Sequence, residues 1–284
     1  LTYFHRVTHV GYLRHLLLRR GDGGEILVHM ITSSQGETDF SPLVEQLLAL
    51  DLEGRIVGVL HMINDLLADV VASQDTRILY GRDFFEEELL GLRFRVSSFS
   101  FFQPNSGAAE RLYGKVAEYA LFALREQQSK EQAEGKLIYD LYCGTGTITQ
   151  LLAKMAGEAV GVEIVEEAVL AARENALRNG IENASFLTGK AEELLPRLVK
   201  EGQRPDVIVV DPPRKGLEPA VIAAIAAASP DRLIYVSCNP ATLSRDAALL
   251  LDQGYSIRRV QPVDMFPFTS HVETVCLMSR IEGK

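Results

Sequence analysis

A cysteine at position 238 stands where a predicted strand gives way to a predicted helix. The residues before it, 233–237, read LIYVS and are typical of a short apolar strand. After it, Asn239 can cap a helix and Pro240 can occupy the first helical position. Backbone N–H groups and the positive end of a helix favour a thiolate over a thiol. The sequence therefore predicts a nucleophilic cysteine, with a buried and inert thiol as the alternative.

Polar residues also follow three other predicted strands. They are Asp140 with Tyr142, Glu163 and Asp211, each close to the end of its own strand. In an open α/β sheet, ligands bind outside the carboxyl ends of the strands. Together with Cys238, these residues predict a single crevice along one edge of the sheet.

The segment 140–146, which reads DLYCGTG, is typical of a turn that lets a ligand approach the backbone closely. Glu163 follows at the distance at which an acid binds ribose hydroxyls. The third glycine of a dinucleotide fingerprint would fall at Thr149, so a pyrophosphate would be poorly accommodated. A nucleoside ligand without phosphates fits better, and S-adenosylmethionine is such a ligand.

Two carboxylates have unusual surroundings. Asp211 begins the segment 211–216, DPPRKG, in which two prolines fix their φ angles and hold the Asp side chain against the crevice. The alternative is a proline turn with a capping Asp. Glu273 lies in an otherwise apolar strand, and a buried carboxylate usually has a raised pKa or a specific partner. We expect a general base at Glu273, with an ion-pair partner as the alternative. Cys143 and Cys276 are expected to be packing residues.

Strands and helices alternate from residue 136 to residue 252, which predicts an α/β fold with a doubly wound, Rossmann-like sheet. Two last strands, near 255–260 and 272–278, are too close in sequence for a crossover helix and predict a hairpin. The fold class predicted is thus an open α/β sheet that ends on an antiparallel pair.

The N-terminal part has a different pattern. A strand, a Gly-Asp-Gly-Gly turn and a second strand over 14–32 predict a hairpin, and Ser41 is expected to cap a short helix. We place a small α+β domain at residues 1–95 and the larger sheet domain at residues 96–284. Apolar positions at helical spacing predict a helix over 106–127 at the start of the second domain.

Composition limits the partners and the setting of the protein. The 284 residues carry a formal net charge of −9, which argues against a broad electrostatic grip on nucleic acid. A local basic strip is still possible, with solvated charge as the alternative. Its residues would be an early cluster of Arg14, His15, Arg19 and Arg20 and a later group of Arg93, Arg95 and Arg111. Three cysteines without CxxC spacing argue against a disulfide framework and a structural zinc site, and they indicate a reducing, cytoplasmic setting.

The ends and the hydropathy of the chain give two more expectations. No apolar run approaches membrane-spanning length and no signal peptide is recognisable, so we expect no membrane partner. The chain starts with Leu1 rather than Met, so we expect further residues upstream.

With these motifs in order, the sequence resembles the S-adenosylmethionine-dependent RNA uracil-C5 methyltransferases, which make 5-methyluridine in ribosomal and transfer RNA. The resemblance runs from about Arg14 to the end of the chain. Its most specific parts are FFQPN at 101–105, DLYCGTG at 140–146, DPPRKG at 211–216, SCNP at 237–240 and HVETV at 271–275.

The resemblance assigns roles to these residues. It implies that Cys238 adds to C6 of uracil, which activates C5 for methylation, and that Glu273 then removes the C5 proton. The positions that it implies for the cofactor S-adenosylmethionine are Gln103, Tyr142, Gly144, Thr147 and Glu163, with Asp211 shared between cofactor and uracil. Because the target base must leave its stack, Phe101 and Phe102 become candidates for stacking on RNA.

Other readings stay open. Enzymes that methylate exocyclic amines also carry an acidic or amide residue before Pro-Pro. Arg214 and Cys238 argue against this class of enzyme. Thr149 argues against the interpretation as a nicotinamide-dependent oxidoreductase. A catalytically silent RNA-binding module would need neither Cys238 nor Glu273. We expect RNA as the partner, with 23S ribosomal RNA favoured over tRNA. Some relatives hold an iron–sulfur cluster through four N-terminal cysteines, which this stretch lacks, so no metal is expected.

Overall fold

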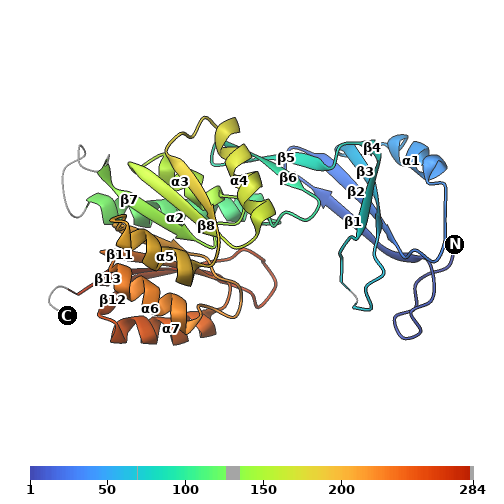
Figure 1. The fold of residues 1–284 in the computed structure, drawn as a ribbon. Coiled ribbons are helices and arrows are strands. Elements are labelled where there is room, and N and C mark those ends of the chain that lie inside the picture. The colour runs from blue at the N-terminus through green and yellow to red at the C-terminus, as the bar shows by residue number, and fades with distance from the viewer. Residues whose placement is uncertain (69, 126–134, 282–284) are drawn as a thin grey trace. The chain divides into compact units, whose positions relative to one another are not determined.

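The computed structural model describes residues 1–68, 70–125 and 135–281. The chain divides into two compact units. Unit 1 consists of Leu1–Glu88 with Arg93–Phe101, and unit 2 consists of Leu89–Leu92 with Phe102–Lys284. Figure 1 shows unit 1 in blue to cyan and unit 2 in green to red. The division into one domain at residues 1–95 and another at residues 96–284 remains a prediction.

Unit 1 is built on a four-stranded sheet with the order β1-β2-β3-β4. Its elements are β1 (Leu13–Arg20), β2 (Glu25–Thr32), α1 (Ser41–Leu48), β3 (Arg55–Ile63) and β4 (Asp75–Gly81). The β1–β2 hairpin confirms the prediction for 14–32. Strands β2 and β3 are parallel, and α1 connects them by packing Val44 and Leu47 against Val28, Ile56 and Val59. A second hairpin follows, β5 (Phe84–Leu89) and β6 (Leu92–Ser97).

One expectation for unit 1 is wrong. Ser41 does not cap α1; the Asp39 carboxylate accepts its backbone N–H at 2.9 Å instead. The basic strip remains a prediction, but the guanidinium groups of Arg14 and Arg19 both donate to backbone carbonyls. Arg14 binds the carbonyl oxygens of residues 64, 66 and 68, and Arg19 binds those of residues 97, 98 and 100. These arginines fasten loops to β1.

Unit 2 contains a seven-stranded sheet with the order β12-β13-β11-β10-β7-β8-β9. Its elements are α2 (Ser106–Arg125), β7 (Leu137–Leu141), α3 (Thr147–Ala153), β8 (Glu158–Glu163), α4 (Glu166–Arg178), β9 (Ala184–Thr188), α5 (Ala191–Lys200), β10 (Val207–Val210), α6 (Pro219–Ala228), β11 (Arg232–Ser237), α7 (Pro240–Asp252), β12 (Tyr255–Val263) and β13 (Glu273–Arg280). The last two residues of the helix predicted over 106–127 lie outside the described part of the chain.

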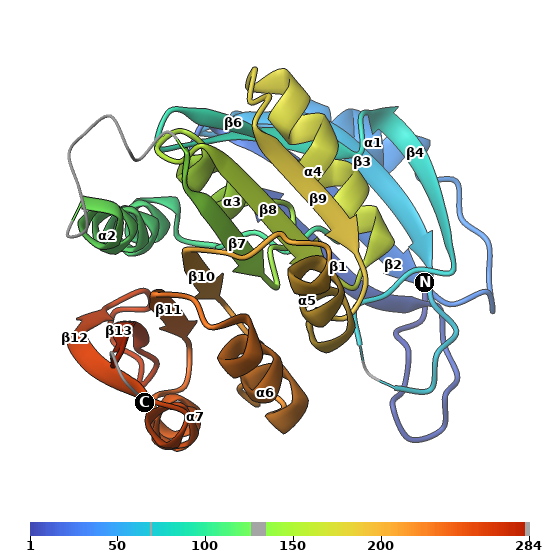
Figure 2. The same cartoon turned by 60° about the vertical axis from the view of Figure 1, so that its left-hand side comes forward.

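Helices cover both faces of this sheet, which confirms the doubly wound α/β fold. Figures 1 and 2 show α2, α3 and α4 on one face and α5, α6 and α7 on the other. Strand β10 reads VIVV and is buried throughout, as expected for a parallel strand that is covered from both sides. The final pair, β12 and β13, is antiparallel, which confirms the predicted hairpin.

The order of the strands fixes where a ligand can bind. From β7 the chain moves to β8 and β9 on one side, and then returns to β10 on the other side of β7. The helices that follow β7 and β10 therefore leave in opposite directions, and a crevice opens between the carboxyl ends of these two strands. Asp140 and Tyr142 lie at the end of β7, and Asp211 follows β10. No helix in the described ranges is long and apolar enough to cross a membrane.

Candidate active site

The register of two antiparallel strands brings Cys238 and Glu273 together. Strand β11 pairs with β13, and the last pair of the ladder is Ser237 with Thr274. Continuing this register by one residue sets Cys238 opposite Glu273, at the carboxyl end of β11 and the amino end of β13. Glu273 is buried, and Cys238 is half-buried. A thiol and a carboxyl group therefore lie next to each other at this end of the ladder.

The helix after Cys238 starts as the sequence predicted. Asn239 is the N-cap of α7, its side-chain oxygen accepts the Ala241 backbone N–H at 3.1 Å, and Pro240 occupies the first turn. The Ser237 hydroxyl accepts the Asn239 N–H at 3.1 Å. These bonds fix the backbone on both sides of Cys238.

The charges around Cys238 differ from those expected. Burial raises the pKa of its thiol, and the carboxyl groups of Glu273 and Asp211 raise it further, while Arg214 lowers it. A backbone hydrogen bond also lowers this pKa, in the direction expected from the sequence, but the net shift is upward. The sequence predicted Asp211 and Glu273 as site residues, but not that their charges raise the pKa of Cys238.

Acidic side chains in this crevice hold their protons to unusually high pH. The pKa of Asp211 is raised to about 8 by burial and then by the charges of Glu273 and Asp140. Burial raises the pKa of Asp140 to about 7, against the hydrogen bond from Thr149. Burial alone raises the pKa of Glu273. Near neutral pH the crevice thus holds both protonated and ionised carboxyl groups, which suits proton transfer.

A buried tyrosine that sequence reasoning missed lies among these groups. Tyr113, on α2, hydrogen-bonds the Gln103 side chain, and its pKa is raised by burial and by Asp211, Asp140 and Glu273. The sequence offered one signal, because a tyrosine on the buried face of a helix needs a partner for its hydroxyl. Gln103 is thereby placed at the crevice with Asp211.

The turn after β7 has the shape predicted for close ligand approach. Tyr142 has a φ of +70°, which is rare for a residue with a side chain and marks a constrained backbone. Gly144 has a φ of +53°, and a Cβ there would meet no atom within 4 Å, so space is open beside it. Thr149, at the place of the missing glycine, is fully buried and donates its hydroxyl to Asp140 Oδ2 at 2.6 Å.

This crevice offers room and polar atoms to a cofactor. Asp140 Oδ1 is buried and has no hydrogen-bond partner within the described part of the chain. The Glu163 carboxylate, at the end of β8, accepts the N–H groups of Gly144 at 3.1 Å, Ile164 at 2.8 Å and Val165 at 3.0 Å. Thr147 is the first residue of α3, directly after this turn. These bonds link the ends of β7 and β8 and hold the Glu163 carboxylate in place.

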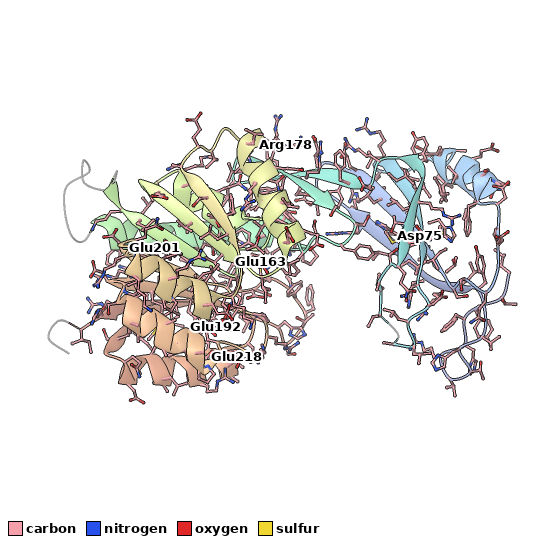
Figure 3. The ribbon with its side chains drawn as sticks, in the orientation of Figure 1. Asp75, Glu163, Arg178, Glu192, Glu201 and Glu218 are labelled. Atoms are coloured by element: carbon pink, nitrogen blue, oxygen red, sulfur yellow. The ribbon has the colours of Figure 1, made fainter. Side chains whose placement is uncertain are left out.

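Further carboxylates surround Tyr142. Figure 3 labels Glu163, Glu192 and Glu218 on the same edge of unit 2, where β8 ends and α5 and α6 begin. Burial raises the pKa of Tyr142 to about 12, with further contributions from Glu192, Glu218, Asp246 and Glu163. This acidic surrounding favours a ligand that carries positive charge.

A network centred on Asp246 fastens the 211–217 loop. The fully buried Asp246 carboxylate on α7 accepts the Leu217 N–H and the Tyr235 hydroxyl, both at 2.7 Å, and Arg245 Nε at 2.8 Å. Arg245 also donates to the Lys215 carbonyl at 2.9 Å. The loop that begins with Asp211 is thus fixed to the helix that begins beside Cys238. Sequence reasoning missed this network, although an Asp within an apolar helix could have indicated it.

The structure does not bring the two predicted stacking residues into one unit. Phe101 ends unit 1 with 73 % of its surface exposed, and Phe102 begins the second segment of unit 2 in a partly buried position. Of the other predicted positions, Gln103, Tyr142, Gly144, Thr147, Glu163, Asp211, Cys238 and Glu273 all belong to unit 2. In the described residues, no group of three or more His, Cys, Asp or Glu side chains could hold a metal ion.

The sequence also matches the model of a known protein family. Residues 61–281 match the family model described as tRNA (Uracil-5-)-methyltransferase. The chain belongs to this family. The match covers the whole described sheet of unit 2 and the end of unit 1, so the crevice lies within the part that defines the family.

Individual relatives are similar over nearly the whole chain. An uncharacterized RNA methyltransferase of Caldanaerobacter subterraneus subsp. tengcongensis is 44 % identical over 99 % of the chain and 60 % of its own length. One of Clostridium tetani is 41 % identical over 99 % of the chain and 59 % of its own length. The chain therefore spans about three fifths of the length of these curated relatives.

A solved structure is similar in both sequence and fold. It is the tRNA (uracil-54, C5)-methyltransferase of Pyrococcus abyssi in complex with S-adenosyl-L-homocysteine, with 30 % identity and a TM-score of 0.77. The similarity covers 95 % of this chain and 61 % of that one. The sheet of unit 2 is thus a Rossmann-like methyltransferase sheet.

Proposed function

We propose that the protein transfers a methyl group from S-adenosylmethionine to C5 of a uridine in RNA. The observation that carries this proposal is the opposition of Cys238 and Glu273 across the β11–β13 ladder. Methyl transfer to an exocyclic amine needs no nucleophile from the enzyme. A module that only binds RNA needs neither Cys238 nor Glu273. Attack at uracil C5 needs both, because C5 must first be activated and must then lose a proton.

Cys238 opens the proposed reaction. Its Sγ adds to C6 of the uracil, the C5–C6 π electrons move onto C5 and O4, and an enolate results. C5 would then take the methyl group of the sulfonium, whose S–CH3 bond breaks to leave a neutral thioether, and it would carry that methyl group as well as its original proton. Glu273 accepts that proton, the C5–C6 double bond returns and the Sγ–C6 bond breaks. The thiolate is regenerated, so atoms and charge balance over the cycle.

The raised pKa of Asp211 suits a role in this reaction. Addition of Cys238 gathers negative charge at the uracil carbonyl oxygen. With a pKa raised to about 8, Asp211 is protonated at neutral pH and can donate a hydrogen bond to such an oxygen. We assign Asp211 to the uracil and to the cofactor, as the family resemblance implies. Glu273 must be ionised to accept the proton from C5.

The residues of the crevice fit S-adenosylmethionine. This cofactor supplies an electrophilic methyl group on a positively charged sulfonium. The open space beside Gly144, the orphaned Asp140 Oδ1 and the acidic surrounding of Tyr142 suit a cationic nucleoside. We assign Glu163 to the ribose hydroxyls, and Gln103, Tyr142, Gly144 and Thr147 to the remaining contacts.

The RNA substrate is proposed on weaker grounds than the reaction. We propose 23S ribosomal RNA, from the resemblance of the DPPRKG loop, and tRNA as the second candidate. The similarity to the Pyrococcus abyssi enzyme, whose name specifies tRNA uracil-54, favours the second candidate. We further propose that residues 1–95 contact the RNA, and that Phe101 or Phe102 stacks on a base.

Release of tritium from C5 tests this function. The full-length protein is incubated with tRNA or 23S rRNA transcripts that carry [5-³H]uridine, with and without S-adenosylmethionine. We expect tritium release only with the cofactor, only from one RNA class, and not with Cys238→Ala. Methylation of either RNA without tritium release would overturn the proposal in favour of an exocyclic amine.

A further inference from the structure

An aromatic side chain stands fully exposed at the edge of the active site. Phe268 lies in the loop 264–272, which joins β12 to β13 and leads directly to Glu273. Its ring has no shielding from the rest of the described chain, with a relative exposure of 108 %. Its φ is +69°, a conformation that costs free energy for a bulky residue. Both features are unfavourable for the isolated protein.

The loop that carries Phe268 is held on both sides. Met265 is fully buried, and its carbonyl oxygen accepts the Asn105 side-chain amide at 3.0 Å. The Phe266 carbonyl accepts the Thr269 hydroxyl at 2.7 Å and the Thr269 N–H at 3.1 Å, which closes a tight turn around Phe268. The Phe266 ring meets His271 edge to face, with centroids 6.5 Å apart. The turn therefore holds the Phe268 backbone in place and presents its side chain to solvent.

The neighbours of Phe268 indicate what it binds. Thr269, Ser270 and His271, which follow Phe268, are polar and exposed, and Pro267 before it is exposed as well. Protein interfaces bury contiguous apolar area at their centre, and one ring beside a proline, followed by three polar residues, provides little of it. A single flat ring bordered by polar groups is instead the arrangement on which nucleobases stack.

The reaction creates a need for such a ring. Glu273 acts on a uracil that has left its stack, and a base next to it loses a stacking partner at that moment. We propose that Phe268 stacks on the nucleobase adjacent to the target uridine and thereby holds the RNA open at the active site. This inference rests on the proposed function. It adds a substrate-positioning contact that lies five residues before Glu273, the proposed general base.

Three substitutions of Phe268 separate stacking from other roles. Phe268→Ala removes the ring, Phe268→Leu keeps an apolar side chain without an aromatic face, and Phe268→Trp keeps the face. Leu177→Ala is the matched control, because Leu177 on α4 is also exposed, at 84 %, and has no place in the active site. All variants are made in the full-length protein. Wild-type protein must first form a covalent adduct with RNA that carries 5-fluorouridine, which tests the proposed function independently.

The readouts are RNA affinity, measured in the Cys238→Ala background, and the fluorescence of 2-aminopurine placed beside the target uridine. We expect Phe268→Ala and Phe268→Leu to weaken RNA binding on the order of tenfold and to leave the fluorophore unquenched. Phe268→Trp and Leu177→Ala should behave like the parent protein, and S-adenosylmethionine affinity should not change. Equal RNA affinity in Phe268→Ala, or full function in Phe268→Leu, would overturn the inference. The second result would show that an apolar side chain without an aromatic face is sufficient.

Discussion

Asp246 on helix α7 accepts the backbone N–H of Leu217 at 2.7 Å, across the gap between the loop after Asp211 and the helix after Cys238. The same carboxylate oxygen accepts the Tyr235 hydroxyl. Because Asp246 is fully buried, each of these donors offsets part of the cost of burying a charge. One carboxylate therefore fixes the two segments that carry Asp211 and Cys238 to each other.

Removing one hydrogen-bond donor from this network should slow catalysis by more than the loss of stability explains. We expect Tyr235→Phe to lower the free energy of unfolding by about 1 to 3 kcal/mol, because a buried carboxylate loses a hydrogen bond. The rate of adduct formation at saturating RNA should also fall, since the 211–217 loop loosens. Urea unfolding and single-turnover kinetics measure the two effects.

Tyr255→Phe is the control for this prediction. Tyr255 is a buried tyrosine of the same sheet, but its hydroxyl donates to the Pro230 carbonyl at 3.1 Å. Its loss should reduce stability and leave the adduct rate unchanged. An equal loss of rate in both variants would show that the Asp246 network has no special positioning role.

The reactivity of Cys238 should respond to the charges around it. Glu273 and Asp211 raise the pKa of the Cys238 thiol, so Glu273→Gln and Asp211→Asn should each lower that pKa. Iodoacetamide should then alkylate Cys238 severalfold faster at pH 8, since the thiolate is the reacting form. Cys143 and Cys276 are buried and should react slowly.

Arg214 provides the opposite test. It lowers the pKa of Cys238, so Arg214→Gln should slow alkylation at the same pH. Faster alkylation in Arg214→Gln, or no change in any of the three variants, would contradict the electrostatic description of the site.

Asp140 should make the stability of the protein depend on pH. Its pKa is raised from 3.8 to about 7 in the folded state, so the folded protein holds a proton that the unfolded chain releases. Stability from this group is fully present below about pH 4 and is lost as pH rises through 7. Between pH 5 and pH 8, the free energy of unfolding of Asp140→Asn should therefore rise relative to that of the wild type, by a few kcal/mol at most. Its Tm should rise relative to the wild type by several degrees over the same interval. A difference in Tm that does not change with pH would refute the assignment.

Glu273→Gln should separate methylation from release. An amide cannot accept the C5 proton, so the Sγ–C6 bond cannot be broken by elimination. We expect a methylated RNA that stays attached to Cys238 and a turnover rate reduced at least a hundredfold. A denaturing gel followed by mass spectrometry of the adduct measures both. Normal turnover without a trapped species would assign the base to another residue.

Much of unit 2 could be predicted because its signals are local. The apolar strands, the Asn239 cap with Pro240, and the short final connection each depend on a few adjacent residues, and the structure has all of them. Likewise, the ends of parallel strands meet at one edge, so the crevice could be predicted from strand order alone.

The interactions that could not be predicted join distant segments. The raised pKa of Cys238 depends on Glu273, which lies opposite only because of the β11–β13 register. Tyr113 meets Gln103 and Asp211 through the packing of α2, and Arg14 and Arg19 find carbonyl partners more than forty residues away. Such contacts follow from tertiary packing, which hydropathy patterns do not contain.

The most direct test of the proposed function uses RNA that contains 5-fluorouridine, together with S-adenosylmethionine and the full-length protein. Fluorine cannot leave C5 as a proton does, so a reaction that begins with Cys238 should stop at a covalent complex. We expect a band that resists denaturation, a methylated fluorouridine attached to Cys238 by mass spectrometry, and no complex with Cys238→Ala. If cofactor binding is intact and neither tRNA nor ribosomal RNA forms this complex, the uracil-C5 mechanism is contradicted.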